Sequence, residues 1–139
     1  MKRFIRLALA PYLLLLLVLP GILACNAETP SVREISQDEL LAGPPAGAVL
    51  LDVRSAREYA SGHVPQAVNI AHDELADHLA EIGASKSDPV IVYCEAGKRA
   101  EMAANVLIEA GYTDVLHLTG DMAGWREAGR PTVQEEALR

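Results

Sequence analysis

The sequence is poor in aromatic residues and in cysteine. Aromatic residues make up 4% of the 139 residues, and only two residues are cysteines. The core must therefore be built mainly from Val, Leu, Ile and Ala, and two cysteines cannot form a disulfide framework. The chain also has no Cys-x-x-Cys, no His-Glu-x-x-His and no Cys/His cluster at ligand spacing. A structural zinc site is therefore not expected.

The remaining composition is that of a globular protein. Half of the residues are apolar and 22% are charged, which excludes a collagen-like or low-complexity chain and argues against wholesale disorder. The length allows one domain and hardly two.

The first 24 residues differ from the rest of the chain. Lys2, Arg3 and Arg6 precede an almost wholly apolar stretch from Leu7 to Ala24. A basic region followed by an apolar region predicts an export signal over residues 1–24. A retained transmembrane anchor is the alternative. It is disfavoured because the stretch is barely long enough to span a bilayer and contains two prolines.

The end of this segment, Ile22-Leu23-Ala24-Cys25, resembles the lipobox of bacterial lipoproteins. That family prefers Leu three places before the cysteine and a smaller residue two places before it. The resemblance implies cleavage before Cys25, lipidation of Cys25 and a stable membrane anchor, with residues 25–31 as a tether. Cleavage after Ala27 is the alternative. In both cases we expect an exported bacterial protein, in the periplasm or held at the cell envelope.

Removal of this segment makes the protein strongly acidic. Three of the twelve basic residues and none of the nineteen acidic residues lie in it, so the remainder has a formal net charge of −10. Such a charge disfavours nucleic acid and anionic membrane surfaces as partners. Removal of the segment and lipidation of Cys25 would also leave Cys94 without a second cysteine to pair with. An unpaired cysteine in an exported protein raises the question of its reactivity.

Short apolar segments alternate with helical patterns after residue 31. Strands are expected at residues 32–35, 49–53, 67–70, 90–93 and 115–118. Helices are expected to begin at the capping boxes Ser36–Glu39 and Ser55–Glu58, and to cover residues 73–82, 99–110 and 122–128. Residues 90–93 are all apolar or aromatic, which predicts burial on both faces. This pattern is typical of an α/β domain with a central parallel sheet.

Cys94 follows the strand expected at residues 90–93 and precedes a helix. In open α/β sheets, ligands bind at the carboxyl ends of the strands. The unpaired N–H groups and the positive dipole end of the next helix favour a thiolate over a thiol, as do Lys98 and Arg99. Gly97 permits a backbone angle that a side chain would disfavour. A nucleophilic Cys94 is therefore predicted, with a buried structural cysteine as the alternative.

Several motifs now occur in an order that resembles a single-domain rhodanese, a sulfurtransferase related to thiosulfate sulfurtransferases. The motifs are residues 51–54 with Glu58 and Tyr59, residues 62–65, residues 67–70, residues 92–94 with Gly97 and Arg99, Gly111 and Tyr112 with Val115, and residues 118–120 with Trp125. They run through most of residues 32–133, which we take as the domain, with residues 134–139 as a charged tail.

The resemblance implies a fold and a reaction. The fold is a central, mostly parallel five-stranded sheet with helices on both faces. The reaction is transfer of sulfur from thiosulfate or a related donor to a thiol or cyanide through a persulfide on Cys94. Main-chain N–H groups of Glu95, Ala96, Gly97, Lys98 and Arg99 would bind the sulfur, and neither a metal nor an organic cofactor is needed. The oligomeric state is left open.

Other residues have supporting or structural interpretations. Asp52 and Arg54 are expected to influence the loop from behind, Arg54 through a salt bridge. His117, between two leucines, is expected to be a hydrogen-bonded strand residue rather than a catalytic base, and Trp125 to fill the core.

Three residues depart from the family pattern. Glu95 stands where many members have Arg, so its carboxylate would repel thiosulfate at short range and favour a less anionic donor. Gln66 and Asp121 stand where glycine is common, which bears on two turns rather than on the chemistry.

Three other functions remain possible. Phosphatases and arsenate reductases that resemble this fold typically place five residues between Cys and Arg, whereas four intervene here. A non-catalytic rhodanese-like binding module would retain Cys94 without using it. A sulfur carrier or thiol sensor would take its sulfur from a partner protein instead of a small donor.

Overall fold

The computed structural model describes residues 31–135. The predicted export signal, the predicted lipidation site Cys25 and the predicted tether up to residue 30 lie outside these residues, as does the tail from residue 136 onward. Among the described residues, no helix has the length and apolar character needed to cross a membrane.

The strands form one five-stranded sheet in the order β1-β5-β4-β2-β3, and every neighbouring pair is parallel. They are β1 (Arg33–Ile35), β2 (Val49–Asp52), β3 (Val68–Asn69), β4 (Val90–Tyr93) and β5 (Val115–Leu118). This confirms the α/β class and the five strands expected from the sequence. The central strand β4 is buried at all four residues, as its uninterrupted apolar run predicts.

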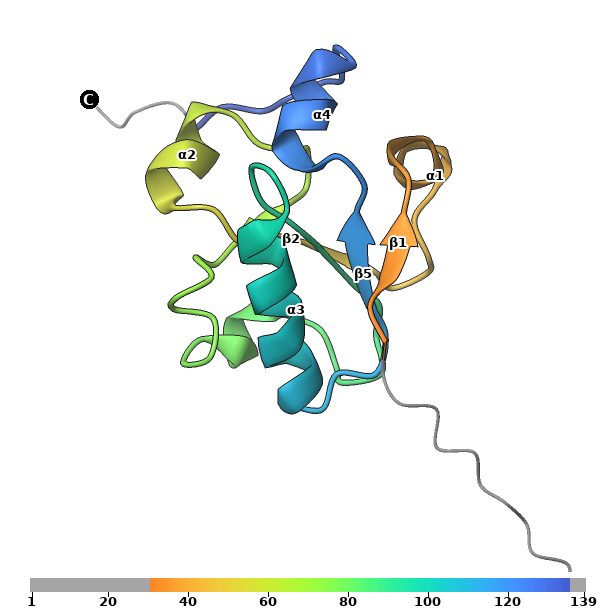
Figure 1. Ribbon diagram of the computed structural model, residues 1–139, viewed down its shortest axis with the longest axis vertical. Helices are drawn as coiled ribbons and strands as arrows, with labels where there is room; N and C mark the ends of the chain where they lie inside the picture. The colour runs from red at the N-terminus through yellow and green to blue at the C-terminus, as the bar shows by residue number, and fades with distance from the viewer. Residues whose placement is uncertain (1–30, 136–139) are drawn as a thin grey trace, which may run out of the picture.

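Helices cover both faces of the sheet, as Figure 1 shows. They are α1 (Gln37–Ala42), α2 (Ala56–Ser61), α3 (Lys98–Glu109) and α4 (Asp121–Glu127), with a short 3₁₀ helix, η1, at Leu79–Ile82. Both predicted capping boxes are present, since Ser36 and Ser55 each exchange hydrogen bonds with the glutamate three residues later. These boxes fix where α1 and α2 begin.

Alternate residues of the strands divide the core into two clusters. On one face Val90, Val92 and Cys94 pack with the alanines and Leu107 of α3. On the other face Ile91 and Tyr93 pack with Trp125 of α4, and with residues of α1 and α2. Trp125 is fully buried, which agrees with its predicted place in the core. The sheet thereby holds β4 rigidly and presents its carboxyl end to the following loop.

The prediction of a helix at residues 73–82 is wrong. The chain instead forms successive turns with hydrogen bonds between residues three apart, such as Asp77 N–H to the Glu74 carbonyl, before η1. The buried side chains of Leu75 and Ile82 account for the misleading apolar spacing. That spacing satisfies a series of tight turns as well as an α-helix, since both place residues three or four apart on one side.

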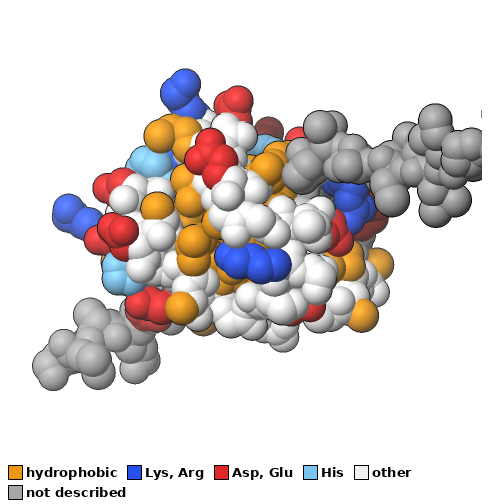
Figure 2. Space-filling model, turned by 90° about the horizontal axis from the view of Figure 1, so that it is seen from below, with side chains coloured by type: hydrophobic (Ala, Val, Ile, Leu, Met, Phe, Trp, Pro, Cys, Tyr) orange, Lys and Arg blue, Asp and Glu red, His pale blue; other side chains and the backbone are white. Residues whose placement is uncertain are grey.

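The surface at the opposite end of the sheet from Cys94 carries mixed charge. Figure 2 views this end and shows single basic side chains standing apart from one another among acidic ones. Grouped basic side chains, which nucleic acid would require, are not seen on this face.

Candidate active site

Cys94 lies directly after β4, at the end of the sheet where the loop turns into α3. Its side chain is 1% exposed. Gly97 caps α3 and donates its backbone N–H to the Cys94 sulfur over 3.1 Å. A backbone donor aimed at sulfur from a helix N-terminus stabilises negative charge there. This is the arrangement that the Cys-x-x-Gly-Lys-Arg sequence predicts.

The conformation of Gly97 explains why the loop closes around the sulfur. Its φ of +100° lies in a region that side chains disfavour. A Cβ at this position would also lie 3.2 Å from a carboxylate oxygen of Asp121. Glycine at position 97 therefore allows both the backbone turn and the close approach of the start of α4 to the loop.

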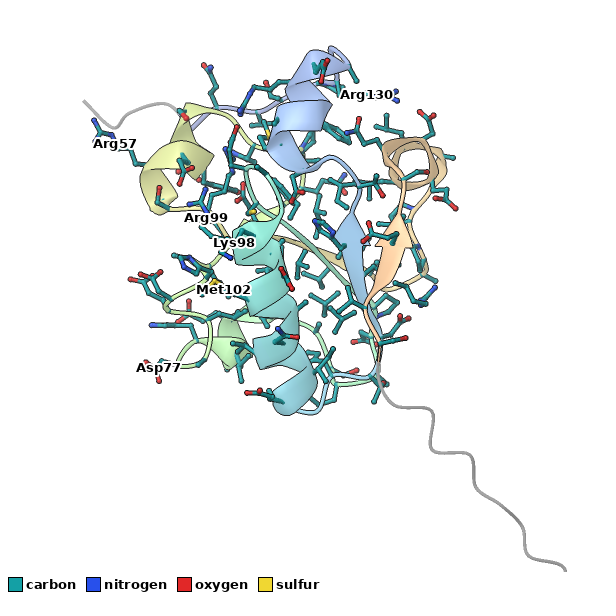
Figure 3. All side chains as sticks on the ribbon, viewed as in Figure 1. Arg57, Asp77, Lys98, Arg99, Met102 and Arg130 are labelled. Atoms are coloured by element: carbon teal, nitrogen blue, oxygen red, sulfur yellow. The ribbon has the colours of Figure 1, made fainter. Side chains whose placement is uncertain are left out.

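Lys98 and Arg99 open α3, and Figure 3 shows both side chains pointing to the side on which α2 lies. Arg99 donates two hydrogen bonds of 2.8 Å to the carboxylate of Glu58 on α2. This pairing raises the pKa of Arg99, with a smaller contribution from Cys94, and lowers the pKa of Glu58. Arg99 is thus held beside the sulfur, whereas Lys98 and Ala96 are exposed at the surface of the loop.

Asp52 and Arg54 form a buried ion pair behind the loop. The Arg54 Nη2 lies 2.7 Å from the Asp52 Oδ2, and both side chains are almost fully buried. Burial opposes the charge of Arg54, but the hydrogen bonds and charge of Asp52 outweigh it and raise the pKa of Arg54. Arg54 also donates to the Gly62 carbonyl over 2.8 Å. The salt bridge expected for Arg54 is therefore present.

Glu95, expected to repel an anionic donor, is itself paired with cations. Its carboxylate bonds to Arg126 of α4 and lies 3.6 Å from the Arg54 Nη1. Its side chain is 36% exposed. The two guanidinium groups offset part of its charge, so the repulsion of an anion is weaker than the sequence alone indicates.

Sequence reasoning missed the contribution of Asp121 to the site. Its carboxylate is buried and accepts the backbone N–H of Cys94 over 2.9 Å. Two further backbone bonds join the start of α4 to the loop, from Met122 to the Cys94 carbonyl and from Ala123 to the Glu95 carbonyl. The unusual residue at position 121 was the available signal. The sequence indicates a turn at this position, and φ is indeed positive at both Asp121 and Gln66.

His117 of β5 connects to the same carboxylate. Its Nε2 lies 3.0 Å from the Asp121 Oδ2, and its Nδ1 lies 3.2 Å from a carboxylate oxygen of Glu34. The hydrogen bond to Asp121 is the main reason why the pKa of His117 rises to about 9. His117 is thus the hydrogen-bonded strand residue that the sequence predicts, but one bound to a residue that holds Cys94.

Comparison with known protein families identifies this arrangement. Residues 36–128 match the model of the family described as "Rhodanese-like domain". The chain belongs to the rhodanese-like family. The family covers Cys94, its loop and every residue of α4, so the resemblance seen in the motifs is confirmed.

Individual rhodanese-like relatives agree with this membership. A thiosulfate sulfurtransferase, GlpE, from Pseudomonas savastanoi pv. phaseolicola is 36% identical over 80 residues, which cover 58% of this chain and 74% of the relative. A crystal structure of a rhodanese-related protein from Thermoplasma volcanium has a TM-score of 0.64 at 26% identity, over 74% of this chain and 99% of the other. A structure titled "rhodanese with anions" from E. coli has a TM-score of 0.54 at 33% identity, over 63% and 98%.

Proposed function

We propose that this rhodanese-like protein is a sulfurtransferase that carries sulfane sulfur on Cys94. The observation that carries the proposal is the 3.1 Å hydrogen bond from the Gly97 N–H to the Cys94 sulfur, in a loop between a buried strand and a helix N-terminus. The relative named thiosulfate sulfurtransferase supports the choice of reaction.

The first half-reaction charges the enzyme. The Cys94 thiolate attacks the outer sulfur of thiosulfate and forms a new S–S bond. The bond between that sulfur and the sulfonate sulfur breaks, and sulfite leaves with the electron pair. The persulfide that remains on Cys94 carries the negative charge at its outer sulfur, next to the N–H groups at the start of α3. No external oxidant or reductant enters this step.

The second half-reaction discharges the enzyme. A thiolate or cyanide attacks the outer sulfur of the persulfide, and the Cys94 thiolate leaves with the electron pair of the broken S–S bond. The acceptor becomes a persulfide or thiocyanate. Because the two substrates react in turn with one residue, the kinetics should be ping-pong.

The charges around the loop bear on the donor. Lys98 is exposed and Arg99 is held at the site by Glu58, so cations stand beside Cys94 in an otherwise acidic protein. Glu95 opposes them but is itself paired with Arg54 and Arg126. The 1% exposure of Cys94 favours a donor that presents a single terminal sulfur atom. Thiosulfate meets this requirement, and a neutral persulfide would meet it with less repulsion from Glu95.

The proposal is tested with the full-length chain, purified in mild detergent because residues 7–24 are almost wholly apolar. The protein is reduced, incubated with thiosulfate and measured by intact mass, and cyanide is then added to measure thiocyanate. We expect the mass of one sulfur atom to be gained, lost with cyanide, and absent in Cys94→Ser. Cys25→Ser is the matched control, because it removes the other cysteine and should leave the gain unchanged.

A folded, reduced protein that gains no sulfur and makes no thiocyanate would overturn thiosulfate as donor. A persulfide gained from a protein donor but retained without turnover would instead identify a sulfur carrier. A chain that never gains sulfur from either source would be a binding module.

We also propose that the protein is exported and anchored through Cys25. The basic residues before position 7, the apolar stretch and the four residues ending at Cys25 support this. Labelling bacteria that express the chain with an alkyne fatty acid should mark the wild type and not Cys25→Ser, and unlabelled wild type would contradict it. The Cys94→Ser variant is the control and should be labelled.

A further inference from the structure

The carboxylate of Asp121 is placed unusually for a residue beside a nucleophilic sulfur. It is buried, accepts the backbone N–H of Cys94 over 2.9 Å, and would lie 3.2 Å from a Cβ at Gly97, the residue that donates to the sulfur. A negative charge this close disfavours the thiolate, because like charges in a buried site raise each other's free energy. Asp121 therefore helps to hold the loop but opposes the charge that the loop stabilises.

His117 removes this conflict. Its Nε2 lies 3.1 and 3.0 Å from the two carboxylate oxygens of Asp121, and its side chain is 23% exposed. With a pKa raised to about 9, His117 is protonated at neutral pH and donates to the carboxylate. The pair then carries no net charge beneath the loop.

The surroundings of His117 are also charged. Glu34 of β1 faces its Nδ1 over 3.2 Å, and Lys98 and Glu101 of α3 line the same surface depression as His117. Thr119 donates to the second oxygen of Glu34 over 3.1 Å and holds that carboxylate in place. Arg99, which is bound to Glu58 of α2, is the other cation whose charge acts on Cys94. Asp121 is thus the member of this set that contacts the backbone of Cys94, and His117 is bound directly to Asp121.

We propose that Asp121 and His117 are positioning residues that act as a charge-compensated pair, in which Asp121 fixes the Cys94 backbone and His117 cancels the charge of Asp121 so that Cys94 forms a thiolate readily. The role concerns the reactivity of the thiol and does not depend on which sulfur donor is used. Removing the carboxylate and removing the imidazole should then have opposite effects on Cys94.

The experiment measures alkylation of Cys94 by iodoacetamide as a function of pH, in the full-length chain in mild detergent. Only the thiolate displaces iodide at an appreciable rate, so the midpoint of the profile reports the thiolate fraction. Peptide mass spectrometry follows Cys94 separately from Cys25. The readout needs no sulfur donor, so it gives a result even if the proposed sulfurtransferase activity fails.

Asp121→Asn keeps an oxygen for the Cys94 N–H but removes the charge, and its midpoint should move to lower pH by about half a unit to one unit. His117→Gln leaves the carboxylate uncompensated, and its midpoint should move to higher pH by about the same amount. The double variant should return close to the wild type. A role that is only structural would not shift the two single variants in opposite directions.

Asp121→Gly provides a second variant in case the asparagine does not fold, because glycine tolerates the φ of +53° at this position. Its midpoint should also move to lower pH. Circular dichroism establishes that each variant is folded. Folded single variants whose midpoints match the wild type, or move in the same direction, would overturn the proposal.

Discussion

Two groups of charged residues flank the Cys94 loop, and they differ in whether their charges can change at mildly alkaline pH. On one side, the buried pair of Asp52 and Arg54 lies behind the loop and reaches Glu95. A guanidinium–carboxylate pair keeps its charges throughout the physiological range. On the other side, His117 supplies the cation for Asp121, and with a pKa raised to about 9 it can lose that charge at mildly alkaline pH.

The comparison separates two tasks in one small site. The side with Arg54 connects β2 to the loop through fixed charges, and its value is structural. The side with His117 connects β5 and α4 to the Cys94 backbone through a charge that depends on pH. Substitutions on the two sides should therefore differ in the size of their effects on stability and reactivity, and in how these effects depend on pH.

The largest effect is expected from breaking the fixed pair. Asp52→Asn leaves the Arg54 guanidinium buried without its counter-charge and should lower the free energy of unfolding by about 3–5 kcal/mol. Thermal unfolding of the full-length chain measures the loss. Glu58→Gln is the matched control, since it weakens the partly exposed pair with Arg99 and should cost about 1 kcal/mol or less. Equal losses in the two variants would contradict the distinction between buried and exposed pairs.

Gly97→Ala should have the next largest effect, because it disturbs the contact between the loop and Asp121. The positive φ alone costs about 1–2 kcal/mol, and the Cβ would press on the carboxylate. Alkylation of Cys94 should slow by about tenfold as the N–H donor moves away. Gly111→Ala is the control, with a φ of +92° and nothing within 4 Å of its Cβ. It should lose stability without altering Cys94, and slowing in both variants would point to general strain.

Glu95→Gln should change the reaction with an anionic donor by a smaller factor. Loss of the carboxylate frees Arg126 and removes one repulsive charge, so thiosulfate should react about three- to tenfold faster at low salt. The gain should shrink at high salt because exposed charges are screened. Arg126→Gln should slow the reaction. Unchanged rates in both variants would mean that these charges lie outside the path of the donor.

A further test is the dependence of stability on pH that His117 produces. Its pKa is raised from 6.5 to about 9 in the folded protein, so the folded state binds more protons between these values. The contribution to stability is full below pH 6.5 and is lost as pH rises through about 9. Thermal unfolding of wild type and His117→Gln across this window should show a steeper decline for the wild type. The pKa of His78, which Glu81 also raises, affects both proteins equally. Parallel curves would contradict the titration of His117 in this range.

How much of the molecule could be predicted from the sequence depends on whether a feature rests on local or on distant contacts. The strands, the capping boxes and the position of the turn from β4 into α3 depend on residues that are close together in the chain, and their places were predicted correctly. Contacts of the loop with Asp121, Arg126 and Glu58 join segments that are far apart, and no local pattern marks them. The helix prediction for residues 73–82 failed for a different reason, because the apolar spacing fits a series of turns as well as a helix.

The pairing of β1 with β5 determines when the sheet can be completed as the chain is synthesised. Ile35 lies opposite Leu118, so one of the first strands of the domain pairs with the last. During synthesis the sheet lacks a neighbour for β1 until residue 118 is available, and the Cys94 N–H lacks its acceptor until Asp121 follows. A nascent chain that already contains the cysteine and its loop therefore still lacks the site. The reactive centre matures only when the final fifth of the polypeptide has joined the fold.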